Sequence, residues 1–325
     1  MKKILVTGGC GFIGSCFVLQ QVKKGNLVIN LDKLTYAANP KNLAEIQGLE
    51  NYFFAEGDIC NQDLVAKILE KFEINLLVNF AAESHVDNSI AKPDDFINTN
   101  IIGTFSLLSA ALNHFKKKSD FKFIHISTDE VFGSLTLNDP KFTEKTAYNP
   151  NSPYSASKAA SDHLVHAWGE TYKLPIIITN CSNNFGPRQH AEKFIPTVIS
   201  SCLNYKNIPI YGNGKNIRDW IFVEDHCNGI ELAIEKGKIG ESYCFGGDCE
   251  MENITIATKI CETLDQIKPR SDSNSYKNQI SFVTDRLGHD FRYAIDSSKV
   301  KKELGFVISK NFDERLKETI NWYLA

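Results

Sequence analysis

Residues 3–14 read Lys-Ile-Leu-Val-Thr-Gly-Gly-Cys-Gly-Phe-Ile-Gly, an apolar run that ends abruptly in closely spaced glycines. Such a run predicts a strand, which passes directly into a Gly-x-x-Gly-x-x-Gly turn and then into a helix. Glycines at Gly8, Gly11 and Gly14 allow a tight turn, a close approach of the backbone to a pyrophosphate, and packing of the helix on the strand. The N-terminus of the helix then faces the phosphates. A glycine turn without a ligand is the alternative, but its place between a strand and a helix favours dinucleotide binding.

The alternation of strand and helix continues through the first half of the chain. Strands are predicted at 3–7, 27–31, 52–56, 76–80, 122–127 and 175–180, and helices at 13–23, 63–72, 94–115 and 153–172. This order predicts an α/β protein with a doubly wound parallel sheet of the Rossmann type.

After residue 180 the pattern loosens into loops rich in Asn, Gly and Pro, with helices near 192–203 and 254–264. We expect a smaller α/β substrate-binding region at the C-terminus that closes over the carboxyl edge of the sheet. The predicted division is a dinucleotide-binding domain of residues 1–180 with part of about 216–240, and a substrate region mostly within 181–325. Residues 225–235 are expected to return and pack on the first domain.

Composition narrows the class of protein. A net charge of −3 carries no signature of polyanion binding, which argues against nucleic acid as a partner. The apolar run at the N-terminus is too short for a signal peptide, and no run of about twenty apolar residues predicts a membrane span. None of the nine cysteines forms a Cys-x-x-Cys pair, so they are interpreted as reduced thiols. We therefore expect a cytoplasmic protein with no membrane contact and no metal site.

Two carboxylates and a lysine bear on the kind of dinucleotide. Asp32 ends the second strand, about twenty residues past the glycines, where a carboxylate accepts from ribose hydroxyls and repels a 2′-phosphate. NAD is therefore favoured over NADP, although a cation at Lys33 could tolerate the phosphate. Asp58 follows the third strand and is placed to receive the adenine amino group. Its alternative role is to cap the helix that follows Asn61.

Tyr154 and Lys158 are a candidate redox pair. Ser152 followed by Pro153 is a favourable helix start, and residues four apart share one face of a helix. A free tyrosine titrates near pH ~10, so a neighbouring ammonium and a positive nicotinamide are expected to lower the pKa of Tyr154. The lysine can also hold the ribose. A surface Tyr and Lys at helical spacing is the alternative, which the glycine turn makes less attractive.

Ser127-Thr128-Asp129-Glu130 ends the fifth predicted strand, at the edge where ligands bind in such folds. Oxidation of a sugar carbon to a ketone acidifies the hydrogen on the next carbon. A base can then remove that proton while an acid protonates a hydroxyl one carbon further on, and two carboxyl groups in different protonation states suit this task. Thr128 could donate to the ketone oxygen. Because consecutive strand residues point to opposite faces, both carboxylates reach one substrate only if the strand has already turned. A solvated acidic loop is the alternative.

At these motifs the chain closely resembles the dTDP-glucose 4,6-dehydratases, members of the extended short-chain dehydrogenase/reductase family. The resemblance covers nearly the whole chain and includes residues 32–36, 81–87, 182–184, 217–220 and 285–290. It implies that Tyr154 takes the proton of the sugar 4-hydroxyl while hydride passes to NAD. Glu130 then removes the C5 proton, Asp129 protonates the departing 6-hydroxyl, and the hydride returns to C6.

The resemblance also implies two sets of contacts. Cofactor contacts are expected at Gly8, Gly11, Phe12, Ile13, Gly14, Asp32, Lys33, Leu34, Thr35, Asp58, Ile59, Phe80, Ala81, Ala82, Ser84, Thr99, Tyr154, Lys158 and Asn184. Nucleotide-sugar contacts are expected at Ser84, Thr128, Asn183, Lys193, Phe194, Pro209, Tyr211, Arg218, Asn253, Arg286 and His289. The chain departs from the family's usual residues at Phe132, Asn180, Arg188, Cys244 and Leu287. Arg188 and Cys244 lie in or beside the substrate region, so the base of the nucleotide stays open.

Three alternatives to dTDP-glucose dehydration remain. One is dehydration of a UDP-, CDP- or GDP-linked hexose. Another is C4 epimerisation, which needs the Tyr/Lys pair but not the two carboxylates. A third, of a different class, is a silent NAD-binding scaffold, which the complete set of chemical groups disfavours. The resemblance further implies a homodimer that pairs through helices near 99–115 and 153–172.

Overall fold

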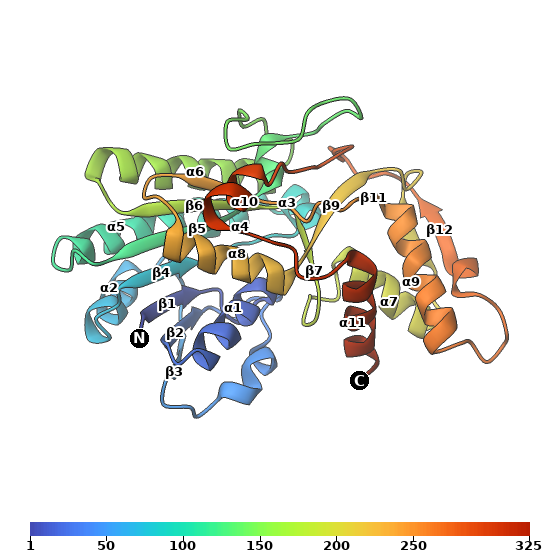
Figure 1. The fold of residues 1–325 in the computed structure, drawn as a ribbon, viewed down its shortest axis with the longest axis horizontal. Coiled ribbons are helices and arrows are strands. Elements are labelled where there is room, and N and C mark those ends of the chain that lie inside the picture. The colour runs from blue at the N-terminus through green and yellow to red at the C-terminus, as the bar shows by residue number, and fades with distance from the viewer.

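The computed structural model describes residues 1–325 and is built around a seven-stranded parallel sheet (Figure 1). The strand order is β10-β6-β5-β4-β1-β2-β3. The chain runs outward from β1 in one direction through β2 and β3, and in the other through β4, β5 and β6, so the order reverses between β1 and β4. Ligands of open parallel sheets bind outside the carboxyl ends of the strands at such a reversal. The strands are β1 (Lys3–Thr7), β2 (Leu27–Asp32), β3 (Tyr52–Glu56), β4 (Leu76–Asn79), β5 (Lys122–Thr128), β6 (Ile176–Cys181) and β10 (Ser242–Phe245).

Helices cover both faces of this sheet, as Figure 1 shows. One face packs against α1 (Phe12–Lys23), α8 (Val223–Lys236) and α10 (Ser298–Leu304), and the other against α2 (Gln62–Lys71), α5 (Thr104–Phe115) and α6 (Pro153–Tyr172). Alternate side chains along β1 follow this division: Ile4 and Val6 lie in the first core, and Leu5 lies in the second. The apolar run that opens the chain is thus buried on both sides, as parallel strands require.

A smaller region with its own core lies beyond one end of the sheet, around α7, α9 and α11 in Figure 1. Its strands form two short sheets, with order β11-β9-β7 and β12-β8. The elements are β7 (Asn183–Phe185), α7 (Phe194–Leu203), β8 (Ile208–Tyr211), β9 (Ile217–Phe222), β11 (Glu250–Glu252), α9 (Asn253–Ile267), β12 (Ile280–Val283) and α11 (Phe312–Leu324). The 3-10 turns are η1 (Pro40–Ile46), η3 (Asp129–Phe132) and η4 (Tyr276–Gln279).

The predicted fold class is confirmed. Residues 225–235 lie in α8, which packs on α1. The segment predicted as one helix at 94–115 is divided into α4 (Pro93–Phe96), a π-helical turn η2 (Ile97–Gly103) and α5, preceded by α3 (Val86–Ala91). Periodicity locates such a helix but not a local change in its hydrogen-bond spacing. β10 joins the large sheet from a part of the chain expected mostly in the second region. None of the helices is both long and apolar enough to cross a membrane.

Candidate active site

The glycine turn lies between β1 and α1 and forms one wall of a cavity at the carboxyl edge of the sheet. Gly8 has φ +71°, and a Cβ there would lie 2.7 Å from the backbone nitrogen of Ala81. A Cβ at Gly14 would collide with the carbonyl oxygen of Gly8. At Gly11 a Cβ would meet only that same oxygen, at 3.3 Å. The first and third glycines are therefore needed by the fold, whereas the second leaves space on the cavity side at the start of α1, where a diphosphate would fit.

The carboxylate of Asp32 is fixed at the end of β2. Its Oδ2 accepts a hydrogen bond from the backbone N–H of Cys10 at 2.9 Å, and its Oδ1 accepts from that of Leu34 at 2.9 Å. Burial raises the pKa of Asp32, and these backbone donors oppose that shift. Asp32 lines the cavity about twenty residues past the glycines, which is the place of a ribose-binding carboxylate.

Lys33 and Asp58 form an ion pair with each other. The ammonium of Lys33 donates to Thr99 Oγ1 at 2.9 Å and lies 3.5 Å from Asp58 Oδ2. Asp58 accepts from the backbone N–H of Cys60, whereas Asn61 caps α2 by accepting from the backbone N–H of Leu64. The alternative reading of Asp58 as the helix cap is therefore wrong, and the charge of Lys33 is partly balanced by that carboxylate.

Tyr154 and Lys158 lie on one buried face of α6, whose start is fixed by Ser152 and Pro153 as predicted. The Lys158 ammonium donates to the carbonyl oxygen of Ile126 at 2.7 Å. Burial raises the pKa of Tyr154 well above its ordinary value, and the carboxylate of Glu130 raises it further. The expected lowering of this pKa by Lys158 is not found, because the ammonium binds the backbone of β5.

Asp129 and Glu130 reach the same cavity because β5 turns immediately after Thr128. The hydroxyl of Thr128 accepts from the backbone N–H of Glu130 at 3.2 Å and so caps the 3-10 turn η3. In a continuing strand the two carboxyl groups would point to opposite faces. The strand has therefore turned before the two carboxylates, which is what both of them need in order to reach one substrate.

The two carboxyl groups differ in their electrostatic surroundings. Burial raises the pKa of Asp129 well above its ordinary value, and the charges of Glu130 and Asp219 raise it further. Its Oδ2 is buried without a hydrogen-bond partner. Burial also raises the pKa of Glu130, but three cations, Arg218, Lys193 and Arg286, oppose that shift. Asp129 is thus suited to hold a proton and Glu130 to lose one.

Most of the predicted residues meet in this one cavity. Those that line it are Gly8, Gly11, Phe12, Ile13, Gly14, Asp32, Lys33, Thr35, Ile59, Phe80, Ala81, Ala82, Ser84, Thr99, Thr128, Asp129, Glu130, Tyr154, Lys158, Asn183, Asn184 and Lys193. Those that do not are Leu34, Asp58, Phe194, Pro209, Tyr211, Arg218, Asn253, Arg286 and His289.

Part of this second group forms a cluster on the smaller region. The Arg286 guanidinium lies 5.7 Å over the ring of Tyr211, whose edge meets His289 with a centroid distance of 6.2 Å. Arg286 also lies 3.5 Å from Asp87, which connects this cluster to the first domain. Arg218 stacks at 4.2 Å on Tyr293. Because Arg286 and Arg218 act electrostatically on Glu130, the cluster and the cavity are neighbours.

Sequence reasoning missed several cavity residues, which share a position at strand ends or in the loops that follow them. They are Leu31, Ala37, Ala38, Gly57, Glu83, Ile126, Ser127, Cys181, Ser182, Gln189, His190 and Glu192. The carboxyl ends of β2, β3, β5 and β6 could have identified those next to the strands. The position of residues 189–192 depends on the second region and carried no local signal.

A dinucleotide-type glycine turn, a tyrosine–lysine pair and two carboxylic acids on one cavity define a Rossmann-fold enzyme of the dehydrogenase and dehydratase class. The family model described as GDP-mannose 4,6 dehydratase matches residues 5–319. The dTDP-glucose 4,6-dehydratase of Xanthomonas campestris pv. campestris is 51% identical over 100% of this chain and 94% of that protein. The Haemophilus influenzae enzyme of the same name is 48% identical, with coverage of 100% and 98%.

Solved structures agree. The dTDP-glucose 4,6-dehydratase of Streptomyces venezuelae with NAD bound superposes with a TM-score of 0.91 at 40% identity, covering 99% of this chain and 97% of that one. A UDP-glucose 4-epimerase of Thermotoga maritima has a TM-score of 0.88 at 26% identity, covering 99% and 98%. The chain belongs to the dTDP-glucose 4,6-dehydratase family, within the larger group of nucleotide-sugar epimerases and dehydratases.

Proposed function

We propose that this chain dehydrates dTDP-glucose to dTDP-4-keto-6-deoxy-glucose. The observation that carries the proposal is the convergence of Tyr154, Asp129 and Glu130 on one cavity. A C4 epimerase needs only the tyrosine–lysine pair, whereas removal of water also needs a base at C5 and an acid at the 6-hydroxyl. The relatives from Xanthomonas campestris and Haemophilus influenzae, about half identical over 94% and 98% of their length, are dTDP-glucose 4,6-dehydratases.

The residues present fit NAD as the cofactor. The open side of Gly11 leaves space for a diphosphate, and the Asp32 carboxylate stands where ribose hydroxyls donate while a 2′-phosphate is repelled. A cation at Lys33 could have tolerated the 2′-phosphate of NADP, but the charge of Lys33 is partly neutralised by Asp58. When bound, NAD supplies the acceptor for the C4 hydride and gives the same hydride back to C6.

Each protein group has a separate proton to move. Tyr154 takes the proton of the 4-hydroxyl during oxidation, for which its phenol must first lose its own proton. Glu130, whose carboxylate is stabilised by Arg218, Lys193 and Arg286, removes the proton at C5 and returns it to C5 when the hydride reaches C6. Asp129, kept protonated by burial, gives its proton to the departing 6-hydroxyl. Thr128 and Ser84 are proposed to contact the hexose from the same wall of the cavity.

The smaller region is proposed to hold the nucleotide and its diphosphate. Lys193, Arg218 and Arg286 are the cations available there, and arginine pairs with phosphate in a bidentate manner. The ring of Tyr211 is exposed beside Arg286 and offers a surface on which a base can stack. The division of the chain into a cofactor domain and a nucleotide-sugar region is part of this proposal.

A homodimer is also proposed. Ile97 and Ile102 of η2, Phe105 of α5 and Tyr172 of α6 are apolar side chains with exposed fractions of 43–50%. Phe105 packs edge-on against Trp168 of α6, which also contacts Tyr172, so exposed apolar side chains of the two helices lie side by side. Light scattering should give twice the chain mass at micromolar concentration; a monomer would contradict this part. A cytoplasmic location stays a prediction from the sequence.

The test is an assay of purified protein with dTDP-glucose and no added NAD. The expected result is a 4-keto-6-deoxy sugar, detected by its absorbance in alkali. UDP-, CDP- and GDP-linked hexoses in parallel reactions decide the base of the nucleotide. Product from none of them would point to a silent scaffold, and a C4 epimer of the substrate would favour epimerisation.

A further inference from the structure

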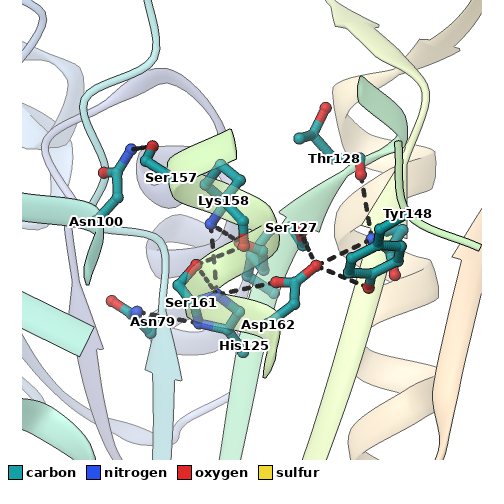
Figure 2. Close-up of polar contacts among 12 residues, drawn as sticks. Asn79, Asn100, His125, Ser127, Thr128, Tyr148, Ser157, Lys158, Ser161 and Asp162 are labelled. Carbon is teal, nitrogen blue, oxygen red and sulfur yellow. Dashed lines mark hydrogen bonds and ion pairs between the residues drawn. The ribbon is translucent and has the colours of Figure 1, made fainter. Parts of the chain in front are cut away.

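A buried polar cluster lies behind the cavity, between β5 and α6 (Figure 2). Its central members are His125, Lys158 and Asp162, with exposed fractions of 1%, 4% and 1%. Figure 2 shows Asp162 between His125 and Tyr148, on the side of α6 that faces the sheet. Of these, only Lys158 lines the cavity.

His125 is a neutral ring with its proton on Nε2. Thr7 Oγ1 donates to Asn79 Oδ1 at 2.6 Å, so the Asn79 amide nitrogen is left to donate to His125 Nδ1, at 3.2 Å. At the other end, Ser161 Oγ donates to the carbonyl oxygen of Lys158 and therefore accepts from His125 Nε2, at 3.2 Å. Both ends require the same tautomer. Burial agrees, because it lowers the pKa of His125 to about 4.

Asp162 is an ionised carboxylate held by donors on several elements. Ser127 Oγ and the Tyr148 hydroxyl donate to its Oδ2 at 2.7 and 2.9 Å, and Asn180 Nδ2 lies 3.5 Å from the same atom. Its Oδ1 lies 3.3 Å from His125 Nε2. Burial alone would raise the pKa of Asp162, but the donors and cation that face it hold that pKa below its ordinary value.

Lys158 is the cation that matches this anion. Its Nζ lies 3.5 Å from the same Nε2 of His125, so one ring nitrogen separates the ammonium from the carboxylate. Burial lowers the pKa of Lys158, and the charge of Asp162 opposes that shift. Because His125 is neutral, Asp162 is the buried counter-charge that this cluster provides for the ammonium.

We propose that Asp162 is a positioning residue that acts through Lys158: its carboxylate keeps the buried amine protonated, while His125 and Ser161 fix the spacing of the pair. The inference rests on the proposed function and on the contact with the NAD ribose that the sequence predicts for Lys158. Without the carboxylate, Lys158 would lose its proton at a lower pH and would bind the ribose as a neutral amine.

Between neutral and alkaline pH, Lys158 is the group in this cluster placed to titrate. His125 titrates at about 4, and the pKa of Asp162 is also low. The other titratable side chains that face the cluster are Tyr148, Tyr154, Cys181 of β6 and Cys244 of β10, and burial raises the pKa of each. A fall in affinity on the alkaline side therefore reports the amine, because ionisation of Tyr154 would instead favour the positive nicotinamide.

The experiment measures the affinity of the full chain for NAD by calorimetry from about pH 6 to about pH 10, after removal of copurified nucleotide. In Asp162→Asn, the pH above which affinity falls should move down by about one unit or more, with near-parental affinity at the acid end. Glu170→Gln removes an exposed charge from the same helix and should leave this midpoint unchanged. Circular dichroism verifies that each variant is folded.

A folded Asp162→Asn variant with the parental midpoint, or with affinity lowered by the same factor at every pH, overturns the proposal. If that variant does not fold, Asp162→Ser also removes the charge and keeps a hydroxyl that can bond to Tyr148. It should shift the midpoint in the same direction, and no shift overturns the proposal. Failure of the parent to dehydrate any nucleotide hexose while it binds NAD would instead contradict the proposed function.

Discussion

Asp129 and Glu130 are adjacent in the chain and open onto one cavity, but their charges are surrounded differently. Glu130 faces Arg218, Lys193 and Arg286, whereas Asp129 faces two carboxylates and, of these cations, Arg218. Different surroundings separate the protonation states of two like groups, which is how one site can hold both an acid and a base. The pair therefore has a built-in direction: Glu130 accepts a proton and Asp129 donates one.

Glu130→Gln should block removal of the C5 proton while oxidation at C4 continues. Reduced nicotinamide should then accumulate in a single turnover, and product formation should fall by about 10²–10⁴-fold, the usual contribution of a positioned base. Stopped-flow absorbance of the reduced cofactor measures the first step, and quenched samples measure product. Product formation at the parental rate would show that another group is the base.

Asp129→Asn should slow the loss of the 6-hydroxyl rather than the oxidation. The defect should be largely relieved by a substrate analogue whose C6 leaving group departs without protonation, since such a group needs no acid. Comparison of the variant with the parent on both substrates measures this. An equal defect on the two substrates would contradict the role of Asp129 as the acid.

The same variant should be more stable than the parent above neutral pH. Because the folded-state pKa of Asp129 is raised, its protonated carboxyl contributes fully to stability below the unfolded-state pKa. This contribution is lost as the pH rises through the folded-state pKa. Asparagine does not ionise, and Asp129→Asn should gain about 1–2 kcal/mol near pH 8 but little near pH 4. Urea unfolding at both pH values measures the difference. A gain that is the same at both values would exclude ionisation of Asp129 as the cause.

Tyr154→Phe should slow reduction of the cofactor itself. Lys158 remains in place in this variant because its ammonium is held by the carbonyl oxygen of Ile126 and not by the phenol. The affinity for NAD should therefore stay near the parental value while the rate of C4 oxidation falls by about 10²-fold or more. Unchanged reduction would remove Tyr154 from the mechanism.

Gly11→Ala should separate cofactor binding from folding. The added methyl group meets one backbone oxygen at 3.3 Å and otherwise enters the space proposed for the diphosphate. Affinity for NAD should fall at least about tenfold, with a melting temperature close to that of the parent. Gly14→Ala is the matched control, because its methyl group collides with Gly8 and should lower the melting temperature as well.

The sequence predicted those parts of the site that depend on local pattern. The β1 strand, the turn at Gly8 and the start of α6 at Pro153 follow from apolar runs, glycine spacing and a cap, all within a few residues. The turn after Thr128 could not be predicted, because a threonine is common both within a strand and as the cap of a helical turn. The π-helical turn at Ile97–Gly103 left no trace in the apolar periodicity.

Contacts between residues far apart in the chain could not be predicted from local sequence patterns. The partner of Lys158 is set by how α6 packs on β5, which brings His125 beside a lysine more than thirty residues away in the chain. For the same reason the lowering of the Tyr154 pKa expected from Lys158 is absent: burial and Glu130 raise that pKa, and neither can be read from a four-residue spacing.

Transfer of a deuterium label is the direct test of oxidation at C4 followed by hydride return to C6. With dTDP-glucose that carries deuterium at C4, the deuterium should appear at C6 of the same product molecule. In a mixture with unlabelled substrate there should be no exchange between molecules, because one cavity holds the ring throughout. Deuterium that stays at C4, is lost to solvent, or is transferred between molecules would contradict hydride return from C4 to C6 within one cavity.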